Sequence, residues 1–108
     1  MEMTVGEIAK AVAAKNDVTT FRDVAVSSVA FDSRKLKKGG LFVPLVGKRD
    51  GHQYFPKARQ NGAAASFWAS DHRPYPHDFP IIVVNNPLRA FQTLANYYRR
   101  KINPKVVA

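Results

Sequence analysis

Hydrophobic and polar positions fall into blocks along the chain, and the first blocks predict a helix followed by a strand. Apolar residues at helical spacing run from Thr4 to about Ala14, and Thr4-Val-Gly-Glu7 has the capping-box pattern that begins a helix. Residues 24–31 are rich in β-branched side chains, which predicts a strand. The alternation slips at Ser27-Ser28, so we expect a bulge or a break there.

The middle blocks predict a strand, a helix and another strand. A turn at residues 37–40 leads into the apolar run 41–46, which suits a buried strand, although Pro44 lacks an amide donor and makes that strand an edge or irregular. A polar loop at 47–51 precedes a short helix at 54–60, which ends at Asn61-Gly62 because glycine adopts the left-handed conformation easily. This helix is then the crossover to a strand at 63–69.

The last blocks predict a long loop, a strand and a helix. Residues 70–80 hold three prolines and form the loop, 81–84 form a short apolar strand, and Asn86-Pro87 begins a helix that runs to Lys101. This order predicts an α/β fold: a single domain, residues 1–104, with a small mixed, largely parallel sheet flanked by helices. Residues 105–108 are expected to be the first strand of another domain.

The composition is that of one soluble domain with a strongly positive charge. The 108 residues include no cysteine, no apolar stretch of about 20 residues that could span a membrane, and no signal-peptide pattern at the start, which favours the cytoplasm. The net charge is +9, and eight basic residues against two acidic ones lie between Asp32 and Arg59. Such a cluster attracts nucleic acid, a phosphorylated ligand or a membrane surface, unless it is only a solvated face.

The chain carries few of the residue patterns that enzymes use. Its three histidines, His52, His72 and His77, lie in predicted loops without metal-ligand spacing, and no glycine run continues into the Gly-Lys-Ser/Thr of an ATP-binding loop. The acidic residues are scattered, so a carboxylate pair for acid–base catalysis is not expected. We therefore predict a binding domain with no catalytic residue and no metal site of its own.

Two short polar segments have the chemistry of an anion site. In Asp32-Ser33-Arg34, the Asp-Ser pair can hold a sharp turn that aims the Arg34 guanidinium outward, toward phosphate or carboxylate. The second segment brings together glycines, which let main-chain amides approach a ligand, and basic side chains. Its residues are Gly47, Lys48, Arg49, Asp50, Gly51 and His52. Each segment alone is equally compatible with a turn that exposes basic side chains.

The positions of the two segments strengthen the prediction of an anion site. Asp32-Ser33-Arg34 ends one predicted strand, and residues 47–52 follow the next one. If these strands run parallel, both segments lie at the carboxyl edge of the sheet, where ligands of open α/β sheets bind. We therefore expect a single notch at this edge that accepts a diphosphate.

The same residues resemble the amino-terminal domain of the Mur ligases of the MurE and MurF types. The likeness includes Asp32-Ser33-Arg34, the run Gly-Leu-Phe-Val-Pro-Leu-Val-Gly at 40–47, and Asp50-Gly51-His52 at the family's gaps. It covers most of the chain and is clearest from 29 to 65. The residues Phe42-Val43-Pro44-Leu45 and the helix at 94–99 favour the MurF type, and the MurE type is the alternative.

The resemblance implies part of an ATP-dependent, cytoplasmic ligase of peptidoglycan synthesis. A MurF-type enzyme adds D-alanyl-D-alanine to UDP-N-acetylmuramoyl-tripeptide, and a MurE-type enzyme adds the third amino acid. Asp32, Ser33 and Arg34 would shape the uridine and phosphate site, and residues 47–52 would cover it, with Lys48 and Arg49 near the diphosphate and His52 beside the nucleotide. ATP and magnesium would bind in the central domain of the same ligase chain, which residues 105–108 would enter.

Two other classes of protein remain open at this point. The charge of +9 permits a small basic nucleic-acid-binding module. Against it, no predicted helix carries a basic stripe, and Phe42, Phe67 and Trp68 lie in apolar runs that indicate core positions rather than exposed stacking platforms. The third class is an interaction domain without a ligand.

Overall fold

Four short strands form a sheet in which every pair of neighbours runs parallel. They lie in the order β3 (Ser28–Ala30), β4 (Gly40–Phe42), β5 (Ala65–Ala69) and β6 (Ile81–Val84). The structure is a computed structural model that describes residues 2–47 and 50–102. It confirms the predicted α/β fold with a largely parallel sheet.

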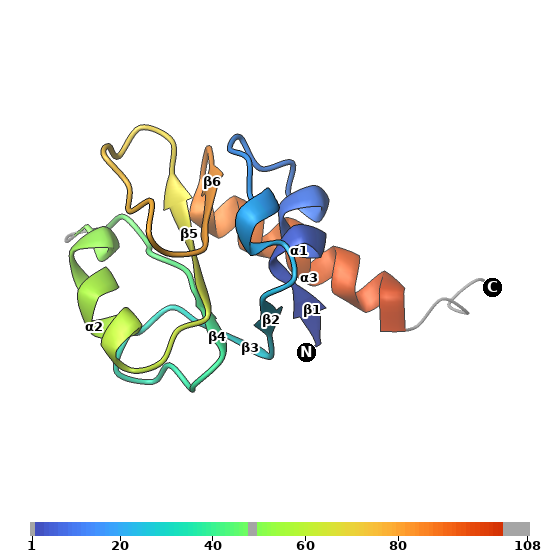
Figure 1. Cartoon of the computed structure of the whole chain (residues 1–108), viewed down its shortest axis with the longest axis horizontal. Coiled ribbons are helices and arrows are strands. Elements are labelled where there is room, and N and C mark those ends of the chain that lie inside the picture. Colours follow the sequence, from blue (N-terminus) through green and yellow to red (C-terminus); the bar gives the residue numbers. More distant parts are fainter. Residues whose placement is uncertain (1, 48–49, 103–108) are drawn as a thin grey trace.

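Both faces of the sheet are covered, because its strands are apolar at consecutive rather than alternate positions. α1 (Val5–Ala11) and α3 (Pro87–Ile102) pack on one face, and α2 (Phe55–Gln60) packs on the other (Figure 1). Neighbouring strand residues divide between two cores: Leu41, Phe67 and Ile82 belong to the first, and Phe42, Trp68 and Val83 to the second. With the faces occupied by helices, a ligand reaches the sheet at the strand ends.

The predicted strand at residues 24–31 is in fact two strands. β2 (Ala25–Val26) pairs antiparallel with β1 (Met3–Thr4), whereas β3 starts at Ser28 in the parallel sheet. Ser27 lies at the predicted break, and its N–H donates to the carbonyl of Gly39 at 3.0 Å. The strand content is therefore mixed, as expected, with the antiparallel part forming a separate pair.

The first helix is shorter than its apolar pattern predicts. Thr4 Oγ1 accepts the N–H of Glu7 at 3.2 Å, so the capping box begins the helix as expected. α1 ends at Ala11, and Ala13 has a φ of 54°, which turns the chain out of the helix before Ala14. Val12 and Ala14 still pack against the first core, which explains the longer apolar pattern. A short 3₁₀ helix, η1 (Thr19–Phe21), follows.

The strand predicted at 41–46 is also shorter, because Pro44 cannot donate to the ladder. β4 ends at Phe42, and the Val43 N–H still donates to the carbonyl of Ala30 at 2.9 Å. A 3₁₀ helix, η2 (Gly51–Tyr54), then leads into α2, so the predicted loop ends one residue early. The crossover closes at Gly62, whose φ of +102° confirms the left-handed end expected there.

The second half of the chain follows the prediction closely. β5 begins at Ala65 rather than 63, the proline-rich loop occupies 70–80, and β6 has its predicted bounds. Asn86 Oδ1 accepts the N–H of Arg89 at 3.1 Å and caps α3, of which Pro87 is the first residue. Residues 103–108, including the expected strand of a further domain at 105–108, lie outside the described residues.

The outer edge of β6 is covered by the segment that follows α1. Asn16 Nδ2 donates to the carbonyl of Ile81 at 2.8 Å, and Asn16 Oδ1 accepts the N–H of Val83 at 2.9 Å. The Lys15 N–H donates to the carbonyl of Val83 at 2.8 Å. One asparagine side chain thus takes the place of a neighbouring strand.

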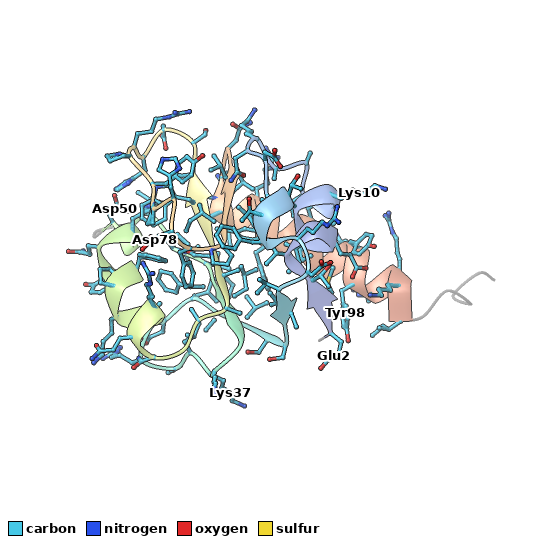
Figure 2. All side chains as sticks on the ribbon, viewed as in Figure 1. Glu2, Lys10, Lys37, Asp50, Asp78 and Tyr98 are labelled. Atoms are coloured by element: carbon cyan, nitrogen blue, oxygen red, sulfur yellow. The ribbon has the colours of Figure 1, made fainter. Side chains whose placement is uncertain are left out.

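Lys37, one of the basic residues of 32–59, lies away from the carboxyl edge of the sheet. Lys37 lies in the turn before β4 and Asp50 in the loop after it, and the two are well separated (Figure 2). The positive charge near Lys37 is therefore remote from the carboxyl edge of the sheet. Among the described helices, none combines the length and apolar character needed to cross a membrane.

Candidate functional site

The two polar segments follow neighbouring strands that run parallel, as the anion-site prediction requires. β3 and β4 pair in register from Ser28 opposite Gly40 to Ala30 opposite Phe42. Asp32-Ser33-Arg34 therefore follows the carboxyl end of β3, and the segment that starts at Gly47 follows the carboxyl end of β4. Lys48 and Arg49 lie outside the described residues, so their predicted place near a diphosphate stays a prediction.

The first segment is a turn built around the carboxylate of Asp32. Asp32 Oδ1 accepts the main-chain N–H of Arg34 at 2.9 Å and its Nε at 3.1 Å, and Oδ2 accepts a terminal guanidinium nitrogen at 2.9 Å. The carbonyl of Ser33, a buried residue, accepts a bond from Asn61 Nδ2 at 2.8 Å, which ties the turn to the end of α2. The turn is therefore held on both sides.

The turn presents its positive charge to solvent. The hydrogen bonds from Arg34, first from its side chain and then from its main chain, lower the pKa of Asp32 to about 2. Asp32 in turn raises the pKa of Arg34, whose side chain is 82% exposed. The Arg34 guanidinium is thus oriented by Asp32 and accessible to an anion. It points outward, as the sequence predicts.

A hollow of about 620 Å³ opens beside this turn. Its lining combines two aromatic rings with two basic side chains around the Asp-Ser pair. The residues are Phe31, Asp32, Ser33, Arg34, Tyr54 and Lys57. Phe31 is 41% exposed and Tyr54 is 39% exposed, so both rings offer surface to a planar group. In the sequence, the one indication that Phe31 and Tyr54 belong to the site is that each lies close to one of the two polar segments.

The second segment closes a loop onto the end of β4. The Gly51 N–H donates to the carbonyl of Leu45 at 2.7 Å, and Val46 and Asp50 form an antiparallel bridge. Asp50 Oδ1 then accepts the N–H of His52 at 2.9 Å and caps η2. The Gly51 main chain and the Asp50 carboxylate therefore hold the described end of this segment against the end of β4.

A second hollow, of about 480 Å³, lies beside this loop. It is bounded by the ends of β5 and β6 and the start of α3. The residues are Pro44, Leu45, Val46, Gly47, Ala69, Asp71, Asn85, Asn86, Pro87 and Leu88. Gly47 of the second segment thus lines this hollow, and Asp32, Ser33 and Arg34 line the first one, whereas the sequence predicts a single notch. Side chains of Asp71, Asn85 and Asn86 join the edge from positions far along the chain.

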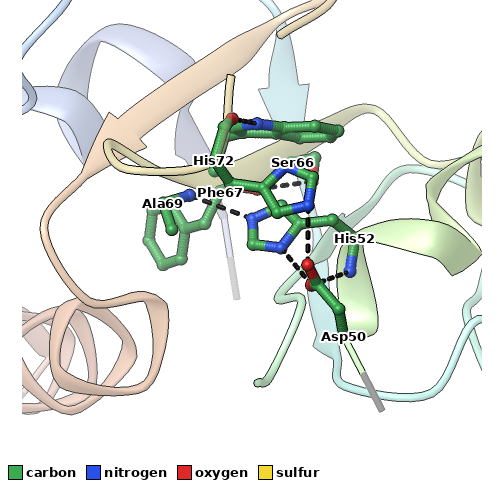
Figure 3. A network of polar contacts seen from close by, with 7 residues as sticks. Asp50, His52, Ser66, Phe67, Ala69 and His72 are labelled. Carbon is green, nitrogen blue, oxygen red and sulfur yellow. Dashed lines mark hydrogen bonds and ion pairs between the residues drawn. The ribbon is translucent and has the colours of Figure 1, made fainter. Parts of the chain in front are cut away.

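His52 is buried inside the protein rather than exposed beside a ligand. Its residue exposure is 3%, its Nδ1 lies 2.6 Å from Asp50 Oδ1, and its Nε2 accepts the main-chain N–H of Ala69 at 3.1 Å (Figure 3). Burial lowers the pKa of His52, although its hydrogen bond to Asp50 acts in the opposite direction. A neutral imidazole therefore joins the loop after β4 to the end of β5.

The fold also brings His72 to this cluster. Its Nε2 lies 2.6 Å from Asp50 Oδ2, and its ring stacks on that of His52 with centroids 4.0 Å apart. Sequence spacing shows no metal-ligand pattern among the histidines, yet the ligand atoms of Asp50, His52 and His72 lie within 4.8 Å of one another. Residues 20 positions apart carry no local signal of such a meeting.

The hydrogen bonds of this cluster do not suit a metal ion. Because His52 Nε2 accepts the Ala69 N–H, the single proton of the neutral ring is on Nδ1 and is donated to Asp50. Metal binding at Nδ1 would move that proton to Nε2, where it would face the Ala69 N–H. The described arrangement is therefore a hydrogen-bonded clamp.

The aromatic residues predicted to be core are buried. Phe42 is 1%, Phe67 0% and Trp68 6% exposed, so none offers the stacking surface that a single-stranded nucleic-acid binder needs. The described edge instead presents two rings, an arginine and a lysine around one hollow. That arrangement fits a small anionic ligand with a planar ring.

Known relatives of the chain are ligases of one family. No protein-family model matches the sequence. Over 108 residues, 99% of this chain and 24% of the relative, it is 32% identical to the UDP-N-acetylmuramoyl-tripeptide–D-alanyl-D-alanine ligase of Bacillus subtilis (strain 168). Over 79 residues, 72% of this chain and 16% of the relative, it is 37% identical to a UDP-N-acetylmuramoyl-L-alanyl-D-glutamate–2,6-diaminopimelate ligase of Bacillus velezensis. The chain thus spans about a quarter of the first relative's length.

A solved structure shares the fold. MurF from Acinetobacter baumannii superposes with a TM-score of 0.75 over 96% of this chain and 22% of its own, at 22% identity. Together with the two polar segments at the sheet edge, these likenesses define the chain as an amino-terminal domain of the Mur ligase family. Within that family it belongs with the MurF type.

Proposed function

We propose that this chain is the substrate-binding amino-terminal domain of an ATP-dependent ligase that adds D-alanyl-D-alanine to UDP-N-acetylmuramoyl-tripeptide in cytoplasmic peptidoglycan synthesis. The domain grips the uridine diphosphate end of the substrate. ATP and magnesium bind in another part of the same ligase chain, which residues 105–108 enter. The domain alone binds the substrate without catalysing the reaction.

The observation that carries this proposal is the pair of polar segments at the carboxyl ends of two parallel strands. At the first, Arg34 is turned outward by Asp32, and Lys57, Phe31 and Tyr54 line the same hollow. A guanidinium and an ammonium suit a diphosphate, and exposed rings suit a pyrimidine. Asp32, Ser33, Arg34 and residues 47–51 are accordingly the proposed contacts, and the buried His52 supports them from inside the protein.

A grip on the nucleotide helps a reaction that occurs elsewhere on the substrate. Binding energy gained at the diphosphate can hold the distant peptide carboxylate in place for phosphorylation and attack by the dipeptide amine. This division of labour fits a domain whose site residues are oriented by hydrogen bonds rather than paired for proton transfer.

A MurE-type ligase, which adds the third amino acid, is the second candidate. The diaminopimelate ligase of Bacillus velezensis supports it, although that match covers 72% of the chain against 99% for the MurF-type relative. Both candidates take a UDP-linked substrate, so they share the proposed role of this domain. Activity of the longer ligase with D-alanyl-D-alanine or with diaminopimelate separates them.

Titration of the 108-residue chain with UDP tests the proposed role. We expect saturable binding by calorimetry, with NMR shifts at Ser33 and Gly51. Arg34→Ala should weaken that binding by about tenfold, since a charge-assisted hydrogen bond to phosphate is lost.

Arg22→Ala is the matched control for this titration. Arg22 is also an exposed arginine beside an aspartate, with Nε 3.9 Å from Asp23 Oδ2, but it lines neither hollow. Its loss should leave UDP binding unchanged. Absence of UDP binding, together with salt-sensitive binding of DNA of any sequence, would replace this proposal by the nucleic-acid module.

A further inference from the structure

Asp50 is held by two histidines from different parts of the chain (Figure 3). Its Oδ1 accepts both the main-chain N–H and the Nδ1–H of His52, which leaves Oδ2 for Nε2 of His72 at 2.6 Å. The first histidine belongs to the same loop as Asp50, whereas the second comes from the proline-rich loop at 70–80. Among the described residues, His72 is therefore the one that ties the Asp50 carboxylate directly to a separate segment.

His72 is itself held in place by several contacts. Its main-chain N–H donates to the carbonyl of Ala69 at 3.0 Å, and its carbonyl accepts Trp68 Nε1–H at 2.5 Å. Its ring is stacked on His52 and stands edge-on to Trp68, with centroids 4.0 Å and 5.6 Å away. These contacts anchor His72 to the carboxyl end of β5, which is buried along its whole length.

The proton of the His72 ring faces Asp50. Among the described residues, His72 Nδ1 is buried and has no hydrogen-bond partner. If the proton were on Nδ1, a buried N–H would be unpaired and Asp50 would lack a donor. An unpaired acceptor at Nδ1 costs less, so Nε2 carries the proton. The bond from His72 Nε2–H to Asp50 is then charge-assisted and strong.

The position of Asp50 sets the wall of the second hollow. Asp50 bridges to Val46, and the next residue, Gly51, bonds the carbonyl of Leu45. Leu45, Val46 and Gly47 line that hollow, and so does Asp71, the neighbour of His72. A displacement of Asp50 would therefore move one wall of the hollow relative to the strand end opposite it.

We propose that His72 is a positioning residue: by holding Asp50 it keeps Asp50 and Gly51, and through them the hollow wall at Leu45 and Val46, in the arrangement that receives the nucleotide. This inference rests on the proposed function, because it assigns to His72 a part in UDP binding without contact to UDP. It adds a residue from the proline-rich loop, outside the two polar segments, to the determinants of the site.

The test compares His72→Ala with His72→Gln in UDP titrations of the 108-residue chain. His72→Ala should weaken UDP binding by about tenfold, because one charge-assisted hydrogen bond that orients the loop is lost. Amide exchange of Gly51 and His52 without ligand should become faster. His72→Gln should restore both, since the glutamine amide can donate from near the position of Nε2.

His77→Ala serves as the control from the same proline-rich loop. The described contact of the His77 ring is with Tyr75, at 4.6 Å between centroids, and it does not line the second hollow. The His77→Ala variant should therefore leave UDP binding and the amide exchange of Gly51 unchanged.

Three results would decide against the inference. If the unchanged chain binds UDP and His72→Ala binds it equally well, the positioning role is wrong while the proposed function stands. If His72→Gln is as weak as His72→Ala, the ring acts by packing and not by donating to Asp50. If the unchanged chain binds no UDP at all, the proposed function and this inference fall together.

Discussion

At the scale of single residues, Gly51 shows how the loop after β4 depends on close contact between main chains. A Cβ atom at this position would lie 2.5 Å from the carbonyl oxygen and 2.6 Å from the nitrogen of Leu45, and 3.1 Å from the carbonyl carbon of Pro44. Main-chain atoms cannot rotate away as a side chain can. The glycine is therefore required for the fold of the loop, whatever ligand the loop binds.

Gly51→Ala should lower the free energy of unfolding by about 1–3 kcal/mol, as expected when extra atoms are forced into a packed place. Urea unfolding followed by circular dichroism measures this change. Gly47→Ala is the control, because no atom lies within 4 Å of a Cβ at Gly47. Equal losses for the two variants would contradict the contact described at Gly51.

At the scale of elements, α3 joins the sheet to α1 in two different ways. Its inner side carries Leu94, which is 1% exposed in the first core. Near its end, Lys101 Nζ lies 2.9 Å from Glu7 Oε2, and the Tyr97 hydroxyl donates to the same oxygen at 2.8 Å. These contacts, with Lys101 first, lower the pKa of Glu7. Exposed ion pairs stabilise little, so the apolar contact dominates.

Leu94→Ala should therefore lower the free energy of unfolding by about 2–5 kcal/mol through the cavity it leaves. Leu88→Ala removes the same side chain from the same helix at a position that is 45% exposed, and should change stability by less than about 0.5 kcal/mol. Thermal unfolding of both variants makes the comparison. A small loss at Leu94 would mean that α3 is not packed on the sheet as described.

At the scale of the whole molecule, burial of His52 links stability to pH. Its pKa is lowered below the ordinary 6.5 in the folded protein, mainly by burial, so the unfolded chain binds the extra proton first as pH falls. The stabilisation that comes from neutral His52 is then fully present above about pH 6.5, and it is lost as the pH falls through the lowered pKa of His52. Burial raises the pKa of Asp50, but its bonds with His52 outweigh this and leave it lowered, which adds a further loss in more acidic solution.

Urea midpoints measured from about pH 7.5 to pH 5 should show this decline. His52→Gln should be less stable at neutral pH and should have a flatter profile, because the titrating ring is gone. His77→Ala should keep the profile of the unchanged chain. An unaltered slope in His52→Gln would assign the pH dependence to other groups.

Much of the fold could be predicted from the sequence, because its signals are local. Residues 81–84 are uniformly apolar between a proline and a polar pair, and Asn86-Pro87 is a helix start by chemistry alone. The parallel pairing of β4 and β5 was expected from the helix between them, whereas the parallel pairing of β3 and β4 was only a condition of the predicted anion site, and the structure meets it. Element ends were less accurate: α1 stops at Ala11 because its last apolar residues pack from a non-helical backbone.

The candidate site could be predicted only in part. Asp32-Ser33-Arg34 and residues 47–52 stood out by residue type, and the structure places the described residues of both segments after the carboxyl ends of β3 and β4. Tyr54 lines one hollow and the start of α3 lines the other, and local patterns place neither of them there. The clamp on Asp50 needs His72 from 22 residues further on, and only tertiary structure brings them together.

The asparagine that covers β6 has a consequence for the behaviour of the protein at high concentration. An uncovered edge strand offers free N–H and carbonyl groups on which another copy can add its own strand, and aggregation starts that way. With Asn16 and Lys15 bonded to Ile81 and Val83, a second molecule would first have to displace them. The Asn16 side chain and the Lys15 main chain thereby protect the sheet from self-assembly along this edge.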